Sequence, residues 1–257
     1  MKQLFRLFSL SRGVRAAGIM CSYAAAAGAQ AAPRGYLQHA LAGASPGLRV
    51  EILEDARITP ALRPLIEAAY GEAPCAADNS QRPPELCAEL AQRPLEPAIV
   101  RLIDSRNREL GRLPLERATA EVLRVPVSRA DSLLGVQVDL SAGIGSYSGP
   151  LVRFVNTRGG RLAWMSIVND VTGRSSDLSL PTTLKTAWRA NLDAPHPELL
   201  LVACRPDLET MDAGGEARFV VTYSRLDLRD DGWHRTDRRA PGCWENEGAF
   251  PPRSLFP

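Results

Sequence analysis

The feature that most constrains the fold is a change of hydrophobic period near residue 95. Before it, apolar residues recur at spacings of three and four from Leu62 to Ala69; after it, apolar and polar residues alternate in short runs. A two-residue period is typical of strands with one buried face. The sequence therefore predicts an α+β fold: a mostly antiparallel β-sheet or sandwich body in residues 95–257, with one or two short helices in residues 59–92.

The expected helices have recognisable starts. Thr59 and Pro60 fit an N-cap followed by a proline in the first helical turn, and Gly71 fits the end of that helix. A second short helix is expected after Pro84, with a narrow apolar face that suits the surface of the body.

Turn residues separate the expected strands. Asp230-Asp231-Gly232 and Thr157-Arg158-Gly159-Gly160 have the composition of hairpin turns. Residues 181–191 are ambiguous, because their apolar residues also fit one helical turn capped by Thr182. The expected strands are Leu48–Leu53, Ala98–Asp104, Arg112–Val127, Leu134–Leu140, Leu151–Val155, Leu162–Val168, Glu198–Cys204, Ala217–Leu228 and Trp233–Arg239.

The N-terminus is typical of an export signal. Basic residues occur from Lys2 to Arg15 with no acidic residue before Glu51, and an alanine-rich apolar run ends at Ala29-Gln30-Ala31, an A-x-A cleavage pattern. An organellar transit peptide and a cut after Ala29 are the alternatives. We expect three parts: a signal peptide in 1–31, an N-terminal helix-containing segment packed on the body in 32–94, and a β-rich domain in 95–257.

Charge and hydropathy exclude several classes of protein. The formal charge is only +2, and the signal contains four of the 31 basic residues, so without it the 29 acidic residues are in excess. This balance does not fit a nucleic-acid binder driven by bulk charge. No apolar run after residue 40 approaches the roughly 18 residues of a membrane span. We expect a periplasmic or secreted protein that is not transmembrane after signal removal.

Cysteine usage agrees with export. After signal removal four cysteines remain, an even number that favours two disulfides in an oxidising compartment. Three pairings exist in principle, and local pairing, Cys75–Cys87 and Cys204–Cys243, is the one we expect. The sequence has no C-x-x-C motif and its histidines are scattered, so we expect neither a metal site nor a cofactor.

The most unusual stretch follows the expected strand at Leu134–Leu140. Its glycines allow close backbone approach, and its free N–H groups suit an anion or a partner surface. It has neither the G-K-[ST] of a phosphate loop nor a G-x-S-x-G elbow. A plain inter-strand loop is the alternative interpretation. The candidate binding residues here are Ser141, Gly143, Gly145, Ser146, Tyr147 and Ser148.

Aromatic residues near the C-terminus are the other candidates for binding. Trp233 and Trp244 flank turns close to the second expected disulfide. Exposed, they would stack on a sugar or anchor a protein; packed against Cys243 and the C-terminal segment, they would be structural.

These patterns favour an exported, non-catalytic protein that binds a protein partner or an envelope component, in the manner of an inhibitor. The alternative is a cell-envelope hydrolase in which Ser146 or Ser148 is activated by His196 or His234. No nucleic-acid partner is expected.

Overall fold

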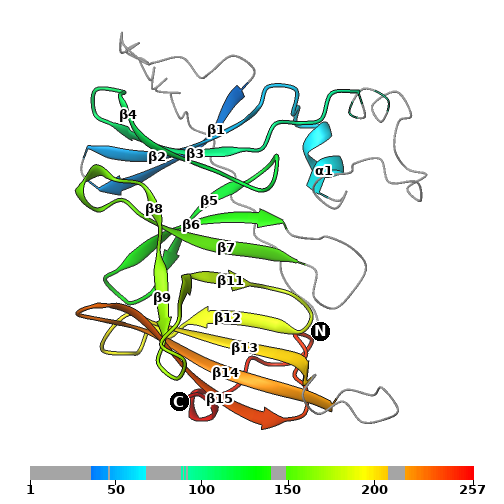
Figure 1. The fold of residues 1–257 in the computed structure, drawn as a ribbon, viewed down its shortest axis with the longest axis vertical. Helices are drawn as coiled ribbons and strands as arrows, with labels where there is room; N and C mark the ends of the chain where they lie inside the picture. Colours follow the sequence, from blue (N-terminus) through cyan, green and yellow to red (C-terminus); the bar gives the residue numbers. More distant parts are fainter. Residues whose placement is uncertain are drawn as a thin grey trace, which may run out of the picture.

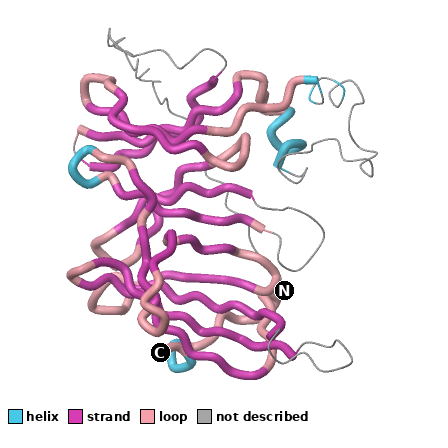
Figure 2. Tube along the Cα trace, in the orientation of Figure 1, coloured by secondary structure: helices cyan, strands magenta, loops and turns pink. Residues whose placement is uncertain are grey.

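The chain folds into three β-sheets stacked as layers (Figure 1). The computed structural model describes residues 36–45, 47–67, 88, 90, 92–139, 149–207 and 218–257. Strands dominate throughout, and the helical segments are short (Figure 2). The expected β-rich, mostly antiparallel body is confirmed. The described helical elements are too short to form a layer of their own, so "mostly β" describes this part of the chain better than α+β.

The upper sheet in Figure 1 has the strand order β1-β2-β3-β4, antiparallel throughout. The expected boundary at residue 94 falls inside this sheet, because two of its strands precede that residue and two follow it. The strands are β1 (Tyr36–Ser45), β2 (Leu48–Asp55), β3 (Ile99–Asp104) and β4 (Glu109–Pro114).

The middle sheet has the order β11-β7-β6-β5, and the short strand β8 also pairs with β7. Its strands are β5 (Glu121–Pro126), β6 (Ser132–Asp139), β7 (Pro150–Asn156), β8 (Ala163–Trp164) and β11 (Ser179–Pro181).

The lower sheet has the order β10-β9-β15-β14-β13-β12, in which only the β15–β9 pair is parallel. Its strands are β9 (Ser166–Asn169), β10 (Ser175–Asp177), β12 (Thr186–Ala190), β13 (Glu198–Asp207), β14 (Arg218–Arg229) and β15 (Gly232–Pro241). As expected, Asp230 and Asp231 turn β14 into β15, and β13 is central.

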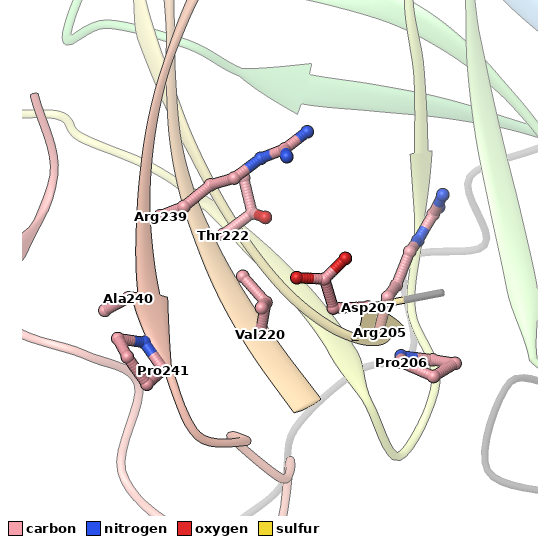
Figure 3. Close-up of a pocket in the computed structure, with 8 residues that line it drawn as sticks. All are labelled: Arg205, Pro206, Asp207, Val220, Thr222, Arg239, Ala240 and Pro241. Carbon is pink, nitrogen blue, oxygen red and sulfur yellow. The ribbon is translucent and has the colours of Figure 1, made fainter. Parts of the chain in front are cut away.

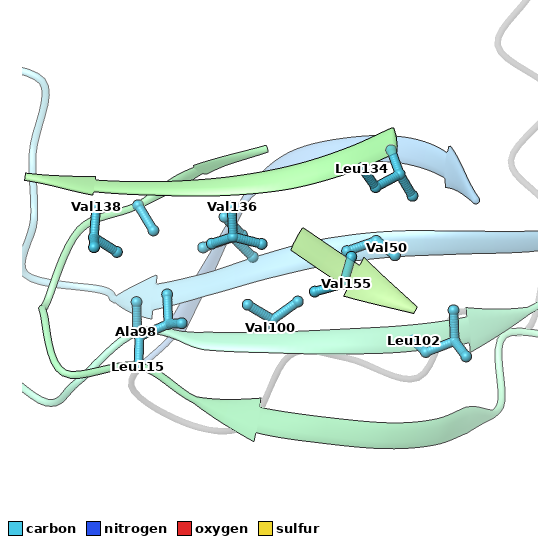
Figure 4. Packing of buried hydrophobic residues seen from close by; sticks show 11 residues of the cluster. Val50, Ala98, Val100, Leu102, Leu115, Leu134, Val136, Val138 and Val155 are labelled. Atoms are coloured by element: carbon cyan, nitrogen blue, oxygen red, sulfur yellow. The ribbon is translucent and has the colours of Figure 1, made fainter. Parts of the chain in front are cut away.

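Two hydrophobic cores separate the three layers. The core between the upper and middle sheets is built largely from valine and leucine, whose branched side chains interdigitate (Figure 4). The core between the middle and lower sheets is larger in side-chain volume and contains Phe154 and Trp233. On β7, Val152 and Phe154 face the lower sheet and Val155 faces the upper one, so the middle sheet is buried on both faces.

The expected strand at Leu162–Val168 divides between two layers. Trp164 pairs with Val155 of β7, as a hairpin would require, but the next residues leave as β9 and pair with β15. Ile167 is only 5% exposed in the core between the middle and lower sheets. Burial of this side chain favours the crossing over continued pairing with β7.

The helical interpretation of residues 181–191 is wrong, because this segment contains β11's last residue and the whole of β12. Ala187 packs on the outer face of the lower sheet, whereas Trp188 packs against the core on the other face. Adjacent side chains point to opposite faces in a strand but not in a helix.

A short helix, α1 (Leu62–Glu67), lies within the first expected helix, whose expected end at Gly71 is outside the described residues. The Leu62 N–H donates to Thr59 Oγ1 at 3.2 Å, which is the expected N-cap interaction. Ile58, Leu62 and Ile66 form a small core with Ala118. The second expected helix falls largely outside the described residues. In the described part of the chain, no helix is long and apolar enough to cross a membrane.

The C-terminal segment covers the outer face of the lower sheet. Phe250 and Phe256 stack with ring centroids 5.7 Å apart, and Phe256 meets Tyr223 of β14 edge to face at 5.5 Å. The 3₁₀ turn η3 (Arg253–Leu255) carries Arg253, whose guanidinium Nε donates to Glu198 Oε1 at 2.9 Å. These contacts hold the segment on β13 and β14.

Gly149, just before β7, tests the close approach of the middle sheet to the segment that precedes β12. Its φ is +155°, and a Cβ there would come within 2.0 Å of the Thr182 carbonyl oxygen. We expect Gly149→Ala to lower the free energy of unfolding by about 1–3 kcal/mol in a denaturant titration. Gly248→Ala is the matched control, because nothing lies within 4 Å of its Cβ position. Equal stability of the two variants would contradict the close approach.

Candidate functional site

The expected Gly-Ser loop connects β6 to β7, and its residues 140–148 lie outside the described residues. Its ends are fixed, because Asp139 pairs with Pro150 across the two strands. The Thr182 N–H also donates to the Pro150 carbonyl at 2.8 Å. The two strand ends that the loop joins therefore lie at the end of the middle sheet that adjoins Thr182, just before β12. Ser141, Gly143, Gly145, Ser146, Tyr147 and Ser148 remain predicted binding residues.

The disulfide Cys204–Cys243 is confirmed, with the two Cα atoms 5.1 Å apart. It joins β13 to the segment after β15 and so spans β14. Cys75 and Cys87 lie outside the described residues, so their pairing stays a prediction.

The two candidate tryptophans are packed side chains. Trp233 is 2% exposed in the core between the middle and lower sheets, where it cannot present a ring face to solvent. Trp244 is half-buried and packs edge to face on Phe250 with centroids 6.3 Å apart. Trp244 thus packs on the C-terminal segment, as the structural alternative described, whereas Trp233 packs in a core on the other face of the sheet.

The two histidines named for a hydrolase lie at one end of the lower sheet. The strand ends that the Gly-Ser loop joins lie near its other end. His196 is exposed in the turn between β12 and β13, beside the start of β13. His234 pairs across from Asp227 near the β14–β15 turn. The loop ends, by contrast, adjoin Thr182, just before β12.

His234 is held between two carboxylates. Nδ1 lies 2.8 Å from Asp170 Oδ1, and Nε2 lies 2.9 Å from Asp231 Oδ1. Carboxylates accept hydrogen bonds, so this geometry favours the imidazolium form, in which both ring nitrogens donate. The hydrogen bond to Asp170, followed by that to Asp231, raises the pKa of His234 above 6.5. Both ring nitrogens are therefore engaged within the protein.

Asp170 is the centre of this cluster. It accepts hydrogen bonds from Arg229, His234 and Thr236, which together lower its pKa from 3.8 to about 2. The hydrogen bonds of Arg229 to Asp227 and Asp170 raise the pKa of that guanidinium in turn. The cluster ties the β9–β10 turn to the β14–β15 hairpin.

The buried charges of the upper sheet are also paired. Glu51 is fully buried and accepts from Arg49 Nε at 2.7 Å and Arg101 Nε at 2.6 Å. Glu54, also fully buried, bonds to Arg63 and accepts the Ala120 N–H at 2.9 Å. These carboxylates are satisfied within the protein and are not candidates for ligand contact.

The candidate site is a groove of about 510 Å³ at the far end of the lower sheet (Figure 3). It lies on the inner face of that sheet, which is the face turned toward the middle sheet. Leu226 on this face is 2% exposed and lies in the core. Thr222 and Val220 on the same face are only half-buried, so burial of the inner face decreases along β14 toward the groove. The groove is lined by Arg205, Pro206, Asp207, Val220, Thr222, Arg239, Ala240 and Pro241.

Two arginines give the groove its chemistry. Arg205 on β13 and Arg239 on β15 are exposed and extend toward the same side above Val220 and Thr222 (Figure 3). Neither guanidinium has an ion-pair or hydrogen-bond partner among the described residues. Asp207 lies between them and has a bonding partner of its own. The arrangement suits a ligand that brings anionic oxygens to two guanidinium groups on strands that flank one intervening strand, β14.

Sequence reasoning missed both arginines. Arg205 falls just after the expected strand Glu198–Cys204, and Arg239 is the last residue of the expected strand Trp233–Arg239, so neither was singled out. One sequence signal could have indicated them. On both β13 and β15, a charged residue occupies a position near the strand end where the alternation points to the inner face.

A second hollow of about 620 Å³ opens between the middle and lower sheets, beside the β14–β15 turn. Trp233 and Trp164 line it with Arg158 and Arg229. Arg229 in this hollow is already bonded to Asp170, with Nη2 2.7 Å from Asp170 Oδ2.

Within the described residues, no three histidine, cysteine or acidic side chains cluster as metal ligands. Comparison with known protein families, with curated proteins and with solved structures finds no match for this chain.

Stability should depend on pH through His234. Its pKa is raised on folding, so its contribution is complete below the unfolded pKa of 6.5 and is lost as pH rises through the folded value. We expect the stability advantage of the wild type over His234→Gln to be largest near pH 6 and to shrink by about pH 9, in urea titrations across that range. A difference that does not vary with pH would contradict the imidazolium assignment.

The disulfide should contribute substantially to stability. We expect Cys204→Ala/Cys243→Ala to lower the free energy of unfolding by about 2–4 kcal/mol, because the bond closes a separation of 39 residues. Denaturant titrations of both proteins without reductant measure this difference, with Cys75 and Cys87 unchanged in each. A loss below about 0.5 kcal/mol would mean that the cross-link is not formed in solution.

Proposed function

We propose that this chain is an exported, non-catalytic binding protein, and that its groove holds a protein partner through the partner's acidic groups. Export through the signal in residues 1–31 would deliver it to the periplasm or outside the cell. Binding without chemistry, as an inhibitor does, is the function that the groove supports best.

The observation that carries the proposal is the pair of open guanidinium groups on one face of the groove. Exposed arginines with no described partner keep their full capacity for bidentate bonds to carboxylate or phosphate oxygens. Val220, Pro206 and Pro241 supply apolar surface beside them. Protein–protein interfaces commonly have an apolar centre with charged groups at its margin.

Rigidity supports the same function. The floor is three paired strands, β13, β14 and β15, and the disulfide Cys204–Cys243 ties β13 to the segment that follows β15. A site that is ordered before binding pays less entropy on association. The strand ends that the Gly-Ser loop joins lie beside Thr182, just before β12, and we include the loop's predicted binding residues in the proposed contact.

The test is capture of the partner by charge-matched variants. The mature protein, tagged after the signal, is incubated with the source cell's envelope fraction under non-reducing conditions, and bound proteins are identified by mass spectrometry. We expect one stoichiometric protein with the wild type, and about a tenfold or greater loss of affinity with Arg205→Gln/Arg239→Gln.

Arg161→Gln/Arg174→Gln is the control, because it removes the same charge from exposed arginines outside the groove. The purified partner should bind the control as it binds the wild type, and more weakly as salt is raised. A partner-free protein, or equal capture by both variants, would overturn the proposal.

A further inference from the structure

We propose that the free edge of β15, from Thr236 to Pro241, receives an extended acidic segment of the partner as an added β-strand. This inference rests on the proposed function and specifies how the groove would be approached. The edge borders the groove directly, because Arg239, Ala240 and Pro241 belong to both.

The edge is open because β9 is short. β9 pairs with β15 only from Trp233 to Arg235. The last backbone hydrogen bond on that side is donated by the Asp170 N–H to the Arg235 carbonyl at 2.9 Å. Beyond it the contacts are between side chains: Thr236 Oγ1 donates to Asp170 Oδ2 at 3.0 Å, and Asn169 Nδ2 donates to Asp237 Oδ2 at 3.2 Å. From Thr236 onward, no described strand lies on this side of β15.

The backbone groups on this edge can be assigned from the register. The Gly242 N–H donates to the Phe219 carbonyl at 2.9 Å, so that pair is a hydrogen-bonded one. Such pairs alternate along an antiparallel ladder. Ala240 and Arg238 therefore bond to β14, whereas Arg239 and Asp237 direct their N–H and C=O groups outward.

An added strand would satisfy these groups. Unpaired N–H and C=O groups on a sheet edge are a template for pairing with another chain, and extended peptides use them in strand addition. Pro241 has no N–H and limits the template at its far end. The usable edge is thus a short stretch centred on Asp237 and Arg239.

Charge selects an acidic segment. Arg238 and Arg239 are exposed and have no described partner, one on each face of β15. Asp237 is already bonded to Arg235 Nε at 2.7 Å. Opposite charges across neighbouring strands stabilise a pair. The edge therefore favours acidic side chains on either face of the incoming strand.

The first experiment is amide hydrogen exchange in the mature protein, read residue by residue by NMR. In the free protein we expect Asp237 and Arg239 amides to exchange much faster than those of Arg238 and Ala240, which bond to β14. Slow exchange at Asp237 and Arg239 in the free protein would mean that the edge is already occupied and would overturn the proposal.

The second experiment uses acetyl-(Glu-Val)₄-amide as the probe, with acetyl-(Lys-Val)₄-amide as the charge control. We expect the acidic peptide alone to bind and to slow exchange at Asp237 and Arg239. Two N-methylated forms separate strand addition from simple charge attraction, one methylated at every glutamate and one at every valine. One form should lose about tenfold or more in affinity, because only one set of amides faces β15.

A matched pair of variants completes the test. Arg239→Pro removes the outward N–H and the charge, whereas Arg239→Gln removes only the charge. We expect Arg239→Pro to bind the peptide more weakly than Arg239→Gln, while both keep slow exchange at Arg238 and Ala240.

Equal binding of the two N-methylated peptides, or no binding of the acidic peptide, would overturn strand addition. Neither result would affect the capture experiment, which depends on Arg205 and Arg239 side chains. If capture fails as well, the proposed function falls with the inference.

Discussion

The architecture depends on the burial of the middle sheet on both faces. An antiparallel sheet usually has one apolar and one polar face, and two sheets then suffice. Here β6 and β7 carry apolar side chains on both sides, as Phe154 and Val155 show at adjacent positions. Each face needs a cover, so the chain supplies one sheet above and one below. The upper sheet is completed by strands from both sides of residue 94.

The groove follows from a mismatch in strand length between layers. β14 has 12 residues, and β13 and β15 have 10 each, whereas β7 has 7 and β11 only 3. The lower sheet therefore extends past its cover, and side chains that continue the inward alternation reach solvent. Arg205 and Arg239 occupy those positions. Apolar residues there would have left an exposed hydrophobic patch, with the association risk that such patches bring.

Sequence patterns predicted the local structure better than the assembly. Alternation located β13, β14 and the Asp230–Gly232 turn, because each is a local property of the chain. It did not separate β8 from β9, because the sheet that residues 166–169 join depends on the burial of Ile167 in the core between the middle and lower sheets. The disulfide followed from cysteine number and compartment. The groove did not follow, because Arg205 and Arg239 become neighbours only once the register of three strands is set. Trp233 was a binding candidate only while its burial was unknown.

The disulfide Cys204–Cys243 lies directly behind the groove, next in sequence to Arg205 and close to Pro241. It connects β13 to the segment that follows β15, and so restrains the movement of both past β14. Under the proposed export, the chain would be made without this restraint and would gain it on oxidation. Formation of the cross-link would then be a step separate from pairing of the strands, and it would restrain the proposed contact surface only after that step.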